Sequence, residues 1–323
     1  MMPPNVADPA ASIAQYAVRS LHAELMLFPK PGLVSAVDNG SHDDMDAALF
    51  MRSLFSLRGY FKATARAGAE RQDFKTLNRL GVQAEERMVQ ATGGVNTHRG
   101  AIFCLGLLCA AAGRSMAERD LQAKTAGRSM AWHADSATTS SVRNASAALP
   151  AFSAAILQGI LMRHWGDALA LHCQQRLPGA HGTEVAIVHG IGGARAQAAA
   201  GMPAVFSVAL PALRATLDTG RGWECARIDA FFHLLAELDD SNVRYRGGAA
   251  GARLVRACGE EFIRRGGTAD PAWRVRAHDM HRRFVTHRLS PGGAADLLAA
   301  TCFVHAITQD GAVNKASRQM ICA

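Results

Sequence analysis

Two carboxylates, a hydroxyl, an amide, two guanidinium groups and two glycines lie within residues 239–248. This mixture suits a site for a metal ion and a polyphosphate, because carboxylates bind hard cations and arginine pairs with phosphate oxygens. A helix interior rarely accepts it, since Asp, Ser and Asn compete for backbone hydrogen bonds and each glycine costs roughly 1 kcal/mol relative to alanine. We therefore predict that the segment ends the apolar stretch 228–238 and then turns.

Glycine or proline stands beside charged residues in a second stretch, residues 29–32. Pro29 and Pro31 stop the first expected helix, because proline removes a donor and restricts the residue before it. Lys30 is then displayed on a rigid turn. It could meet a phosphate, or it could be a solvated lysine after a plain helix stop.

A third stretch, residues 93–100, leads into an apolar helix. A glycine-bearing loop at a helix start exposes backbone N–H groups to an anion. Asn96 or Thr97 could cap the helix, while His98 and Arg99 add side-chain donors. The lysine and hydroxyl ending of a phosphate-binding Walker loop is missing. The alternative is that His98 only makes structural hydrogen bonds.

Acidic residues cluster at another expected helix start, residues 41–46, with Ser41 as the N-cap. Acids near the positive end of a helix dipole can be purely structural. They can also bind metal, because Mg²⁺ needs only one or two carboxylates together with water and substrate phosphates. We expect Asp43 or Asp44 to share such an ion with Asp239 or Asp240.

The last stretch, residues 290–296, predicts a helix with Ser290 as N-cap and Pro291 at its first position. Asp296 then stands on a helix that is mainly apolar through residue 306. A carboxylate at the border of a buried helix needs a partner, so a metal or an arginine is expected beside it. The alternative is a place on the surface.

Taken together, these motifs resemble the family of triphosphoribosyl-dephospho-CoA synthases over residues 21–303. The matching pieces, in family order, are Glu24 with 29–34, then 40–45, 96–101, 201–203, 239–242 with 246–248, and 290–298. Segments 35–42 and 193–201 resemble the malonate decarboxylase branch more closely, and the citrate lyase branch stays as the alternative. Gln197 departs from the pattern, since many relatives have a glutamate there, and glutamine cannot act as a base.

The resemblance implies that ATP and 3′-dephospho-CoA are the substrates and that adenine is released. The product would pass to a carrier-protein transferase as a prosthetic-group precursor for an acyl-carrier subunit. It also implies roles for the residues. His98 or Asp296 would be catalytic and would handle the proton, and Mg²⁺ would be held by Asp43, Asp44, Asp239 and Asp240. The expected substrate-binding residues are Lys30, Asn96, Thr97, Arg99, Arg195, Arg246, Gly247, Gly248, Ser290 and Gly292.

The cysteine pattern and the apolar runs limit the class of protein independently of the family resemblance. The seven cysteines form no C-x-x-C pair, which favours reduced thiols in a cytoplasmic protein over a disulfide framework or a zinc site. No basic region precedes an apolar run at the N-terminus, and the longest apolar run, 101–113, is shorter than the roughly 20 residues a membrane span needs. We expect no membrane segment.

The formal charge of +8 is carried mostly by arginine, which suits phosphate-bearing ligands or reflects nucleotide composition alone. Aromatic residues make up only 6% and do not alternate with basic ones, which argues against a nucleic-acid partner. A metal-dependent nucleotide hydrolase would use the same acids and loops, and it remains an alternative function.

The elements that must position these residues are helices, because apolar residues recur at three- and four-residue spacing and alternation at period two is absent. We predict an all-α fold, a single multi-helix domain over residues 1–323 with functional residues at helix ends and in loops. A loop or insertion is expected at 125–146 and a loose tail at 309–323. The predicted helices are 10–28, 44–69, 74–91, 101–119, 147–164, 184–200, 227–238, 249–265, 271–287 and 294–306.

Overall fold

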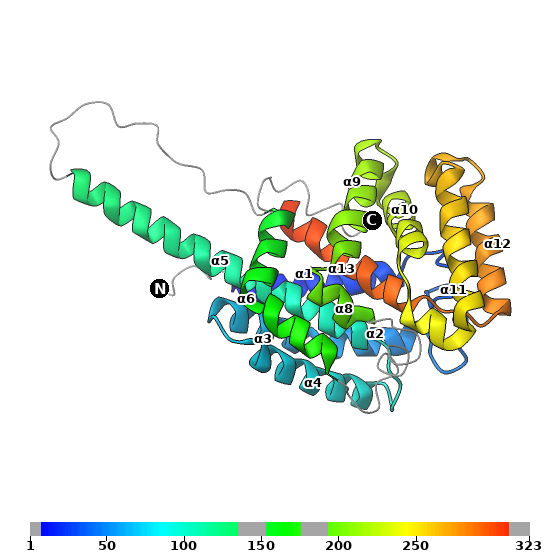
Figure 1. Ribbon diagram of the computed structural model, residues 1–323, viewed down its shortest axis with the longest axis horizontal. Helices are drawn as coiled ribbons and strands as arrows, with labels where there is room; N and C mark the ends of the chain where they lie inside the picture. Colours follow the sequence, from blue (N-terminus) through cyan, green and yellow to red (C-terminus); the bar gives the residue numbers. More distant parts are fainter. Residues whose placement is uncertain (1–7, 135–152, 176–192, 310–323) are drawn as a thin grey trace, which may run out of the picture.

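A computed structural model describes residues 8–134, 153–175 and 193–309, and these residues form helices and connecting loops without a β-strand (Figure 1). The all-α prediction is confirmed. The helices are α1 (Pro9–Leu25), α2 (Ala47–Ser56), α3 (Arg58–Ala69), α4 (Phe74–Ala91), α5 (Arg99–Ala134), α6 (Ala154–Gln174), α8 (Gly193–Ala199), the π-helical η1 (Ala204–Ala209), α9 (Leu210–Asp218), α10 (Gly222–Glu237), α11 (Ser241–Arg264), the 3₁₀ helix η2 (Gly267–Ala269), α12 (Trp273–Thr286) and α13 (Gly292–Gln309).

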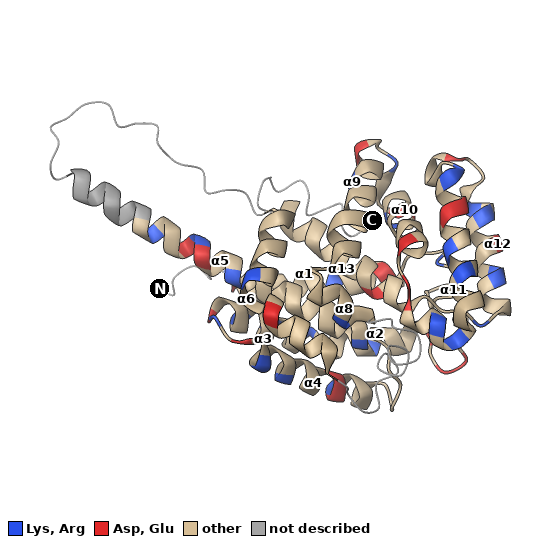
Figure 2. Ribbon diagram, viewed as in Figure 1, with Lys and Arg blue, Asp and Glu red and all other residues tan. Residues whose placement is uncertain are grey.

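Helix α13 runs through the middle of the molecule and contacts α1, α5 and α10 (Figure 1). Its residues are buried on all sides, and a helix that is apolar all round belongs inside a core. Figure 2 shows Lys, Arg, Asp and Glu concentrated on outer helices such as α11 and α12, whereas α13 carries one charged residue, Asp296. The final helix therefore brings a single carboxylate into the interior.

Within the described ranges, one helical stretch, Arg99–Thr125 of α5, is long and apolar enough to cross a membrane, and 72% of its apolar window is buried inside the protein. The N-terminal half of this stretch packs against α3 and α13. Its apolar character is accounted for by that packing, since core helices of folded domains carry the same composition.

Several predicted helix ends are wrong. Helix α5 continues to Ala134, so residues 125–134 of the predicted loop are helical, and residues 135–146 lie outside the described ranges. Of the predicted tail, Gln309 ends α13 and the rest lies outside them. The predicted helix 44–69 divides at Leu57 into α2 and α3. The predicted helices leave out α9, in which Pro211 stands in the first turn, where proline is tolerated.

Residues 239–248 also differ from the prediction. The apolar helix does end, at Glu237, but Ser241 immediately opens α11, which bends at Gly248. Gly248 has φ 58° and ψ −155°, a region almost confined to glycine. A Cβ on Gly247 would lie 2.4 Å from Leu289 Cδ2. Gly247 therefore leaves space for the Leu289 side chain, and Gly248 allows the helix to bend. The segment is therefore a helix start with a break, not an open loop.

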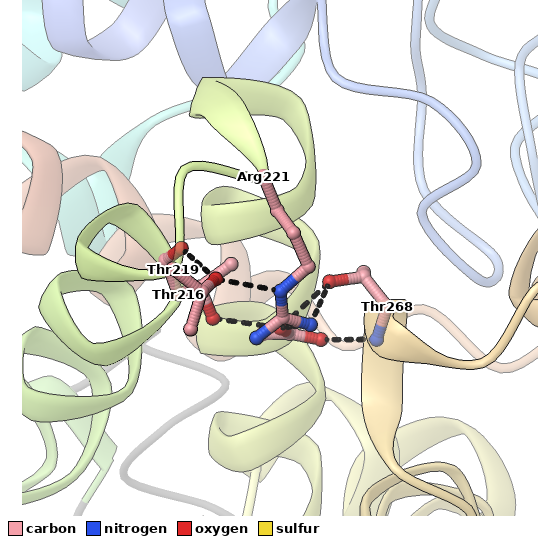
Figure 3. A network of polar contacts seen from close by, with 5 residues as sticks. Thr216, Thr219, Arg221 and Thr268 are labelled. Carbon is pink, nitrogen blue, oxygen red and sulfur yellow. Dashed lines mark hydrogen bonds and ion pairs between the residues drawn. The ribbon is translucent and has the colours of Figure 1, made fainter.

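Helices α9, α10 and η2 are joined through the buried carboxylate of Asp229 (Figure 3). It accepts hydrogen bonds from the Thr216 hydroxyl at 2.7 Å and from the Thr268 amide at 2.8 Å and hydroxyl at 2.7 Å. Arg221 lies 3.3 Å from the same carboxylate and donates to Thr219 at 2.8 Å. Because the carboxylate is both hydrogen-bonded and ion-paired, it fixes the positions of α9 and η2 relative to α10.

Candidate active site

Lys30 lies inside the protein, with no exposed surface, and its ammonium group donates to the carboxylate of Glu24 from the last turn of α1. The alternative of a solvated lysine is wrong. Burial lowers the pKa of Lys30 and raises the pKa of Glu24, and the attraction between the two charges opposes both shifts. Pro29 and Pro31 flank Lys30, and the Phe28–Pro29 bond is cis.

His98, at the start of α5, is 2% exposed, and its ring forms a short hydrogen-bonded chain. The Thr97 hydroxyl donates to the Ser53 hydroxyl at 2.6 Å, and the Ser53 oxygen lies 2.6 Å from His98 Nδ1. Ser53 is thus left to donate to Nδ1, which places the ring proton on Nε2. Nε2 is buried and has no hydrogen-bond partner among the residues that the structure describes. Ser53 escaped the sequence analysis because a serine inside an amphipathic helix carries no pattern.

Burial lowers the pKa of His98 to about 3, and the nearby charge of Lys30 lowers it further. The ring is therefore neutral near pH 7. A neutral imidazole with its proton on Nε2 is a hydrogen-bond donor there.

Asp296, in the first turns of α13, faces the start of α5. A Cβ on Gly100 would lie 2.1 Å from Asp296 Oδ2, so only glycine lets the two helices approach this closely. Burial raises the pKa of Asp296 well above its ordinary value, and the charges of Glu24 and Asp240 add to the increase, while a hydrogen bond from the Ala101 amide opposes it. The alternative of a place on the surface does not hold, because Asp296 is half-buried against the start of α5.

Asp240 caps two helices at once. Its Oδ1 accepts from the Asn242 amide at 2.8 Å at the start of α11, and its Oδ2 accepts from the Ala294 amide at 2.9 Å at the start of α13. The predicted cap Ser290 is wrong, because its hydroxyl instead lies 2.7 Å from His42 Nε2. Burial raises the pKa of Asp240 in spite of these backbone hydrogen bonds.

The other predicted metal ligands have another partner or are exposed. The Asp239 carboxylate is held by both ends of the Arg244 guanidinium at 2.7 and 2.8 Å. The Asp43 side chain is 92% exposed and lies 3.8 Å from Arg288, and the Asp44 side chain is 61% exposed. In the described ranges no three His, Cys, Asp or Glu side chains are arranged to hold a metal ion. These residues do not fit a preformed magnesium cage.

The start of α2 is not capped by the residue that the sequence predicts. Asp46, not Ser41, caps α2, by accepting from the Leu49 amide at 2.7 Å. The Ser41 hydroxyl donates to the Leu289 carbonyl oxygen at 2.6 Å and ties this loop to the chain before α13.

The predicted phosphate-binding arginines point to three different places. Arg99 donates to Glu85 at 3.0 Å, and Arg195 donates to the Gln175 carbonyl oxygen at 2.8 Å. Arg246 is exposed and donates to the Ser41 carbonyl oxygen at 3.1 Å, beside His42. Of the three, only Arg246 lies with the α11 and α13 starts.

Two smaller residues take backbone roles. The Asn96 side chain, not that of Thr97, accepts from the Arg99 amide, at 3.2 Å, and so caps α5. The Gln197 side-chain oxygen accepts from the Ala204 amide at 3.2 Å. The residue that departs from the family pattern therefore supports the turn into η1.

Over residues 10–315 the chain matches the family model described as CitG: ATP:dephospho-CoA triphosphoribosyl transferase. It is 38% identical over 304 residues to a probable 2-(5''-triphosphoribosyl)-3'-dephosphocoenzyme-A synthase of Stutzerimonas stutzeri, covering 93% of this chain and 92% of the relative. A relative of the same name from Pseudomonas fluorescens is 36% identical over 320 residues, covering 96% and 98%. The chain belongs to this family. No solved structure matches it.

Members of the triphosphoribosyl transferase family use ATP and dephospho-CoA, and this chain is accordingly a transferase that uses ATP. Its interior group of Glu24, Lys30, His98, Asp240 and Asp296, called the polar centre below, lies where α5, α11 and α13 begin. Helix starts carry partial positive charge and unpaired amides, which favours anionic ligands. The polar centre adds a neutral donor and carboxylates of raised pKa, the groups that proton transfer to and from a nucleotide requires.

Proposed function

We propose that the polar centre joins ATP to 3′-dephospho-CoA. The 2′-hydroxyl oxygen of the dephospho-CoA ribose bonds to C1 of the ATP ribose, the bond from C1 to adenine breaks with its electron pair on adenine, and the triphosphate stays on the transferred ribose. The hydroxyl proton leaves to a base, and adenine departs protonated. Glycosyl transfer of this kind develops positive charge on the sugar, which nearby carboxylates stabilise.

In this proposal Asp296 receives the hydroxyl proton. A carboxylate with a raised pKa is a stronger base, and burial among other carboxylates raises the pKa of Asp296. His98 donates from Nε2 to the departing adenine, because that nitrogen is buried, carries the ring proton and has no partner in the described ranges. This unpaired donor is the observation on which the assignment rests most heavily.

We assign the triphosphate to the helix starts together with Arg246 and Lys30. Arg246 is exposed beside Ser290 and His42, where a phosphate could replace its backbone carbonyl partners. Lys30 adds positive charge from the interior, close enough to His98 to lower the pKa of that ring. Arginine supplies a planar fork and lysine a point charge, so the two contribute differently to phosphate binding.

The expected result with purified protein, ATP, Mg²⁺ and 3′-dephospho-CoA is release of adenine and formation of a triphosphoribosylated dephospho-CoA in a ratio of one to one. Chromatography of the mixture with mass detection measures both products. ADP and phosphate as the only products would contradict the proposal. Adenine formed equally fast without dephospho-CoA would support the hydrolase alternative, in which water replaces the ribose hydroxyl.

Mg²⁺ is proposed to enter with the triphosphate. The chain offers no preformed cage in its described ranges, but Mg²⁺ bound to substrate phosphates needs only one or two protein carboxylates, and the carboxylate of Asp240 lies at the start of α13. We expect EDTA to abolish adenine release and added Mg²⁺ to restore it. Calorimetric titration should show much weaker ATP binding in EDTA. Full turnover in thoroughly chelated enzyme would exclude the metal.

The pathway is proposed to be that of malonate decarboxylase in the cytoplasm, with the product handed to a carrier-protein transferase. Support comes from segments 35–42 and 193–201, which resemble that branch. Incubating the product with such a transferase and the apo acyl-carrier subunit of either enzyme tests this. Labelling of the citrate lyase subunit alone would favour the alternative branch.

A further inference from the structure

A second polar group lies where α9, α10 and the end of α13 meet. It consists of Arg214, Trp223, Arg227, His305 and Thr308 and is called the arginine cluster below. Arg214 donates to the Thr308 hydroxyl at 3.0 Å, the Arg227 guanidinium carbon lies 5.3 Å from the centre of the Trp223 ring, and that ring meets His305 edge-on at 5.1 Å. The sequence motifs do not include any of these residues.

The arginine cluster is separate from the polar centre. His305 follows Asp296 on the same helix by about 14 Å of helical rise, on roughly the opposite side of the axis. The cluster is held in place by the Asp229 network of Figure 3, which fixes α9 against α10. It is therefore a rigid group at a distance from the proposed chemistry.

The positive charge of the cluster is not neutralised. Among the described residues, neither Arg214 nor Arg227 forms an ion pair with a carboxylate. The nearby acid Asp229 is paired with Arg221, and Glu224 is paired with Arg274. Asp218 is close enough to act on His305 electrostatically, but it is exposed and pairs with neither arginine.

Within the described part of the chain, three buried nitrogen atoms in the cluster have no hydrogen-bond partner: Arg214 Nε, Arg227 Nε and His305 Nδ1. His305 is only 6% exposed. Buried polar groups in folded proteins are nearly always paired, so the two unpaired Nε–H groups, both on arginines that act electrostatically on His305, indicate a missing acceptor. Burial and the two arginine charges lower the pKa of His305 to about 4, so the ring is neutral near pH 7 and adds no third charge.

We propose that the arginine cluster binds a phosphate group, as an anion site separate from the polar centre. Guanidinium groups match the tetrahedral oxygens of phosphate with paired donors, and an oxyanion would supply the acceptor that the unpaired nitrogens lack. The phosphate is either free inorganic phosphate or that of a nucleotide. The proposal extends beyond the transferase reaction and does not depend on it.

Calorimetric titration of the full chain with inorganic phosphate tests the proposal, with substitution of Arg214 and of Arg227 by glutamine in separate variants. Each variant is expected to bind phosphate at least tenfold more weakly. Arg274→Gln is the matched control, because Arg274 also lies over a tryptophan, Trp273 at 4.5 Å, but is paired with Glu224 at 2.6 Å. Its phosphate affinity should not change, and adenine release without added phosphate should be normal in all three variants.

A second measurement keeps the test independent of folding. Phosphate is expected to change the tryptophan fluorescence of the unmodified protein, and Trp223→Phe should remove that change while retaining an aromatic ring beside His305.

Titration with Mg²⁺-free ATP distinguishes the two sources of phosphate. If ATP competes with inorganic phosphate equally in the unmodified protein and in Asp240→Asn, the cluster binds a nucleotide phosphate. If ATP does not compete, the cluster binds free phosphate. Absence of phosphate binding, or equal weakening in Arg274→Gln, would overturn the proposal.

Discussion

Replacement of His98 by alanine is expected to lower adenine release by roughly 10²–10⁴-fold while leaving ATP binding nearly intact, the range for general acid–base help. The ring is neutral, because burial lowers its pKa to about 3, and its Nε2 donor is unpaired among the described residues. It can therefore assist the departing adenine without attracting the triphosphate. Single-turnover rates and calorimetry of ATP binding measure the two effects separately.

Three variants serve as controls for His98. Ser53→Ala should give a smaller loss, because Ser53 only fixes the ring proton on Nε2, and Ser53→Thr should recover most of it. Asp240→Asn should weaken both ATP binding and folding, since Asp240 caps two helices. A His98→Ala enzyme that turns over normally, or one that loses only ATP affinity, would remove His98 from the catalytic step.

Substitution of Lys30 by methionine is expected to destabilise the protein by about 3–5 kcal/mol, the cost of leaving one member of a buried ion pair uncompensated. The partner left behind is Glu24, 5% exposed inside the polar centre. The double variant Lys30→Met with Glu24→Leu removes both charges and should recover a large part of the loss. Urea denaturation of the three proteins at pH 7 gives the free energies of unfolding.

The comparison for Lys30 is Lys62, whose side chain is 38% exposed and pairs with Asp8 at 3.0 Å. Lys62→Met should change stability far less, because water screens an exposed pair. If Lys30→Met and Lys62→Met destabilise equally, or if the double variant is as unstable as the single one, Glu24 and Lys30 do not form a coupled buried pair.

Apolar periodicity in the sequence was enough to predict the all-α fold, because a helix repeats its buried face every three or four residues. Helix boundaries were harder. Asp46 and Asp240 resemble turn or metal residues in sequence, and their capping roles depend on which amides the folded chain brings to them. Only tertiary contact decides between a cap and a ligand.

The candidate site was predicted in part. The structure places His98 and Asp296 in the polar centre, but Asp43 and Asp44 are exposed and Asp239 is paired with Arg244. Burial of Lys30 could not be read from its neighbours, since lysine is almost never fully buried without a partner, and its partner is six positions earlier on another element. Ser53 comes from a helix that carries no motif at all.

The double cap formed by Asp240 has a consequence for local opening. One carboxylate accepts from the amides of Asn242 and Ala294, so fraying of either helix start takes away an acceptor that positions the other. Amide hydrogens at the two helix starts should therefore exchange with deuterium at similar rates, although they are far apart along the chain. The starts of α11 and α13 beside the polar centre would then open and close as one cooperative unit.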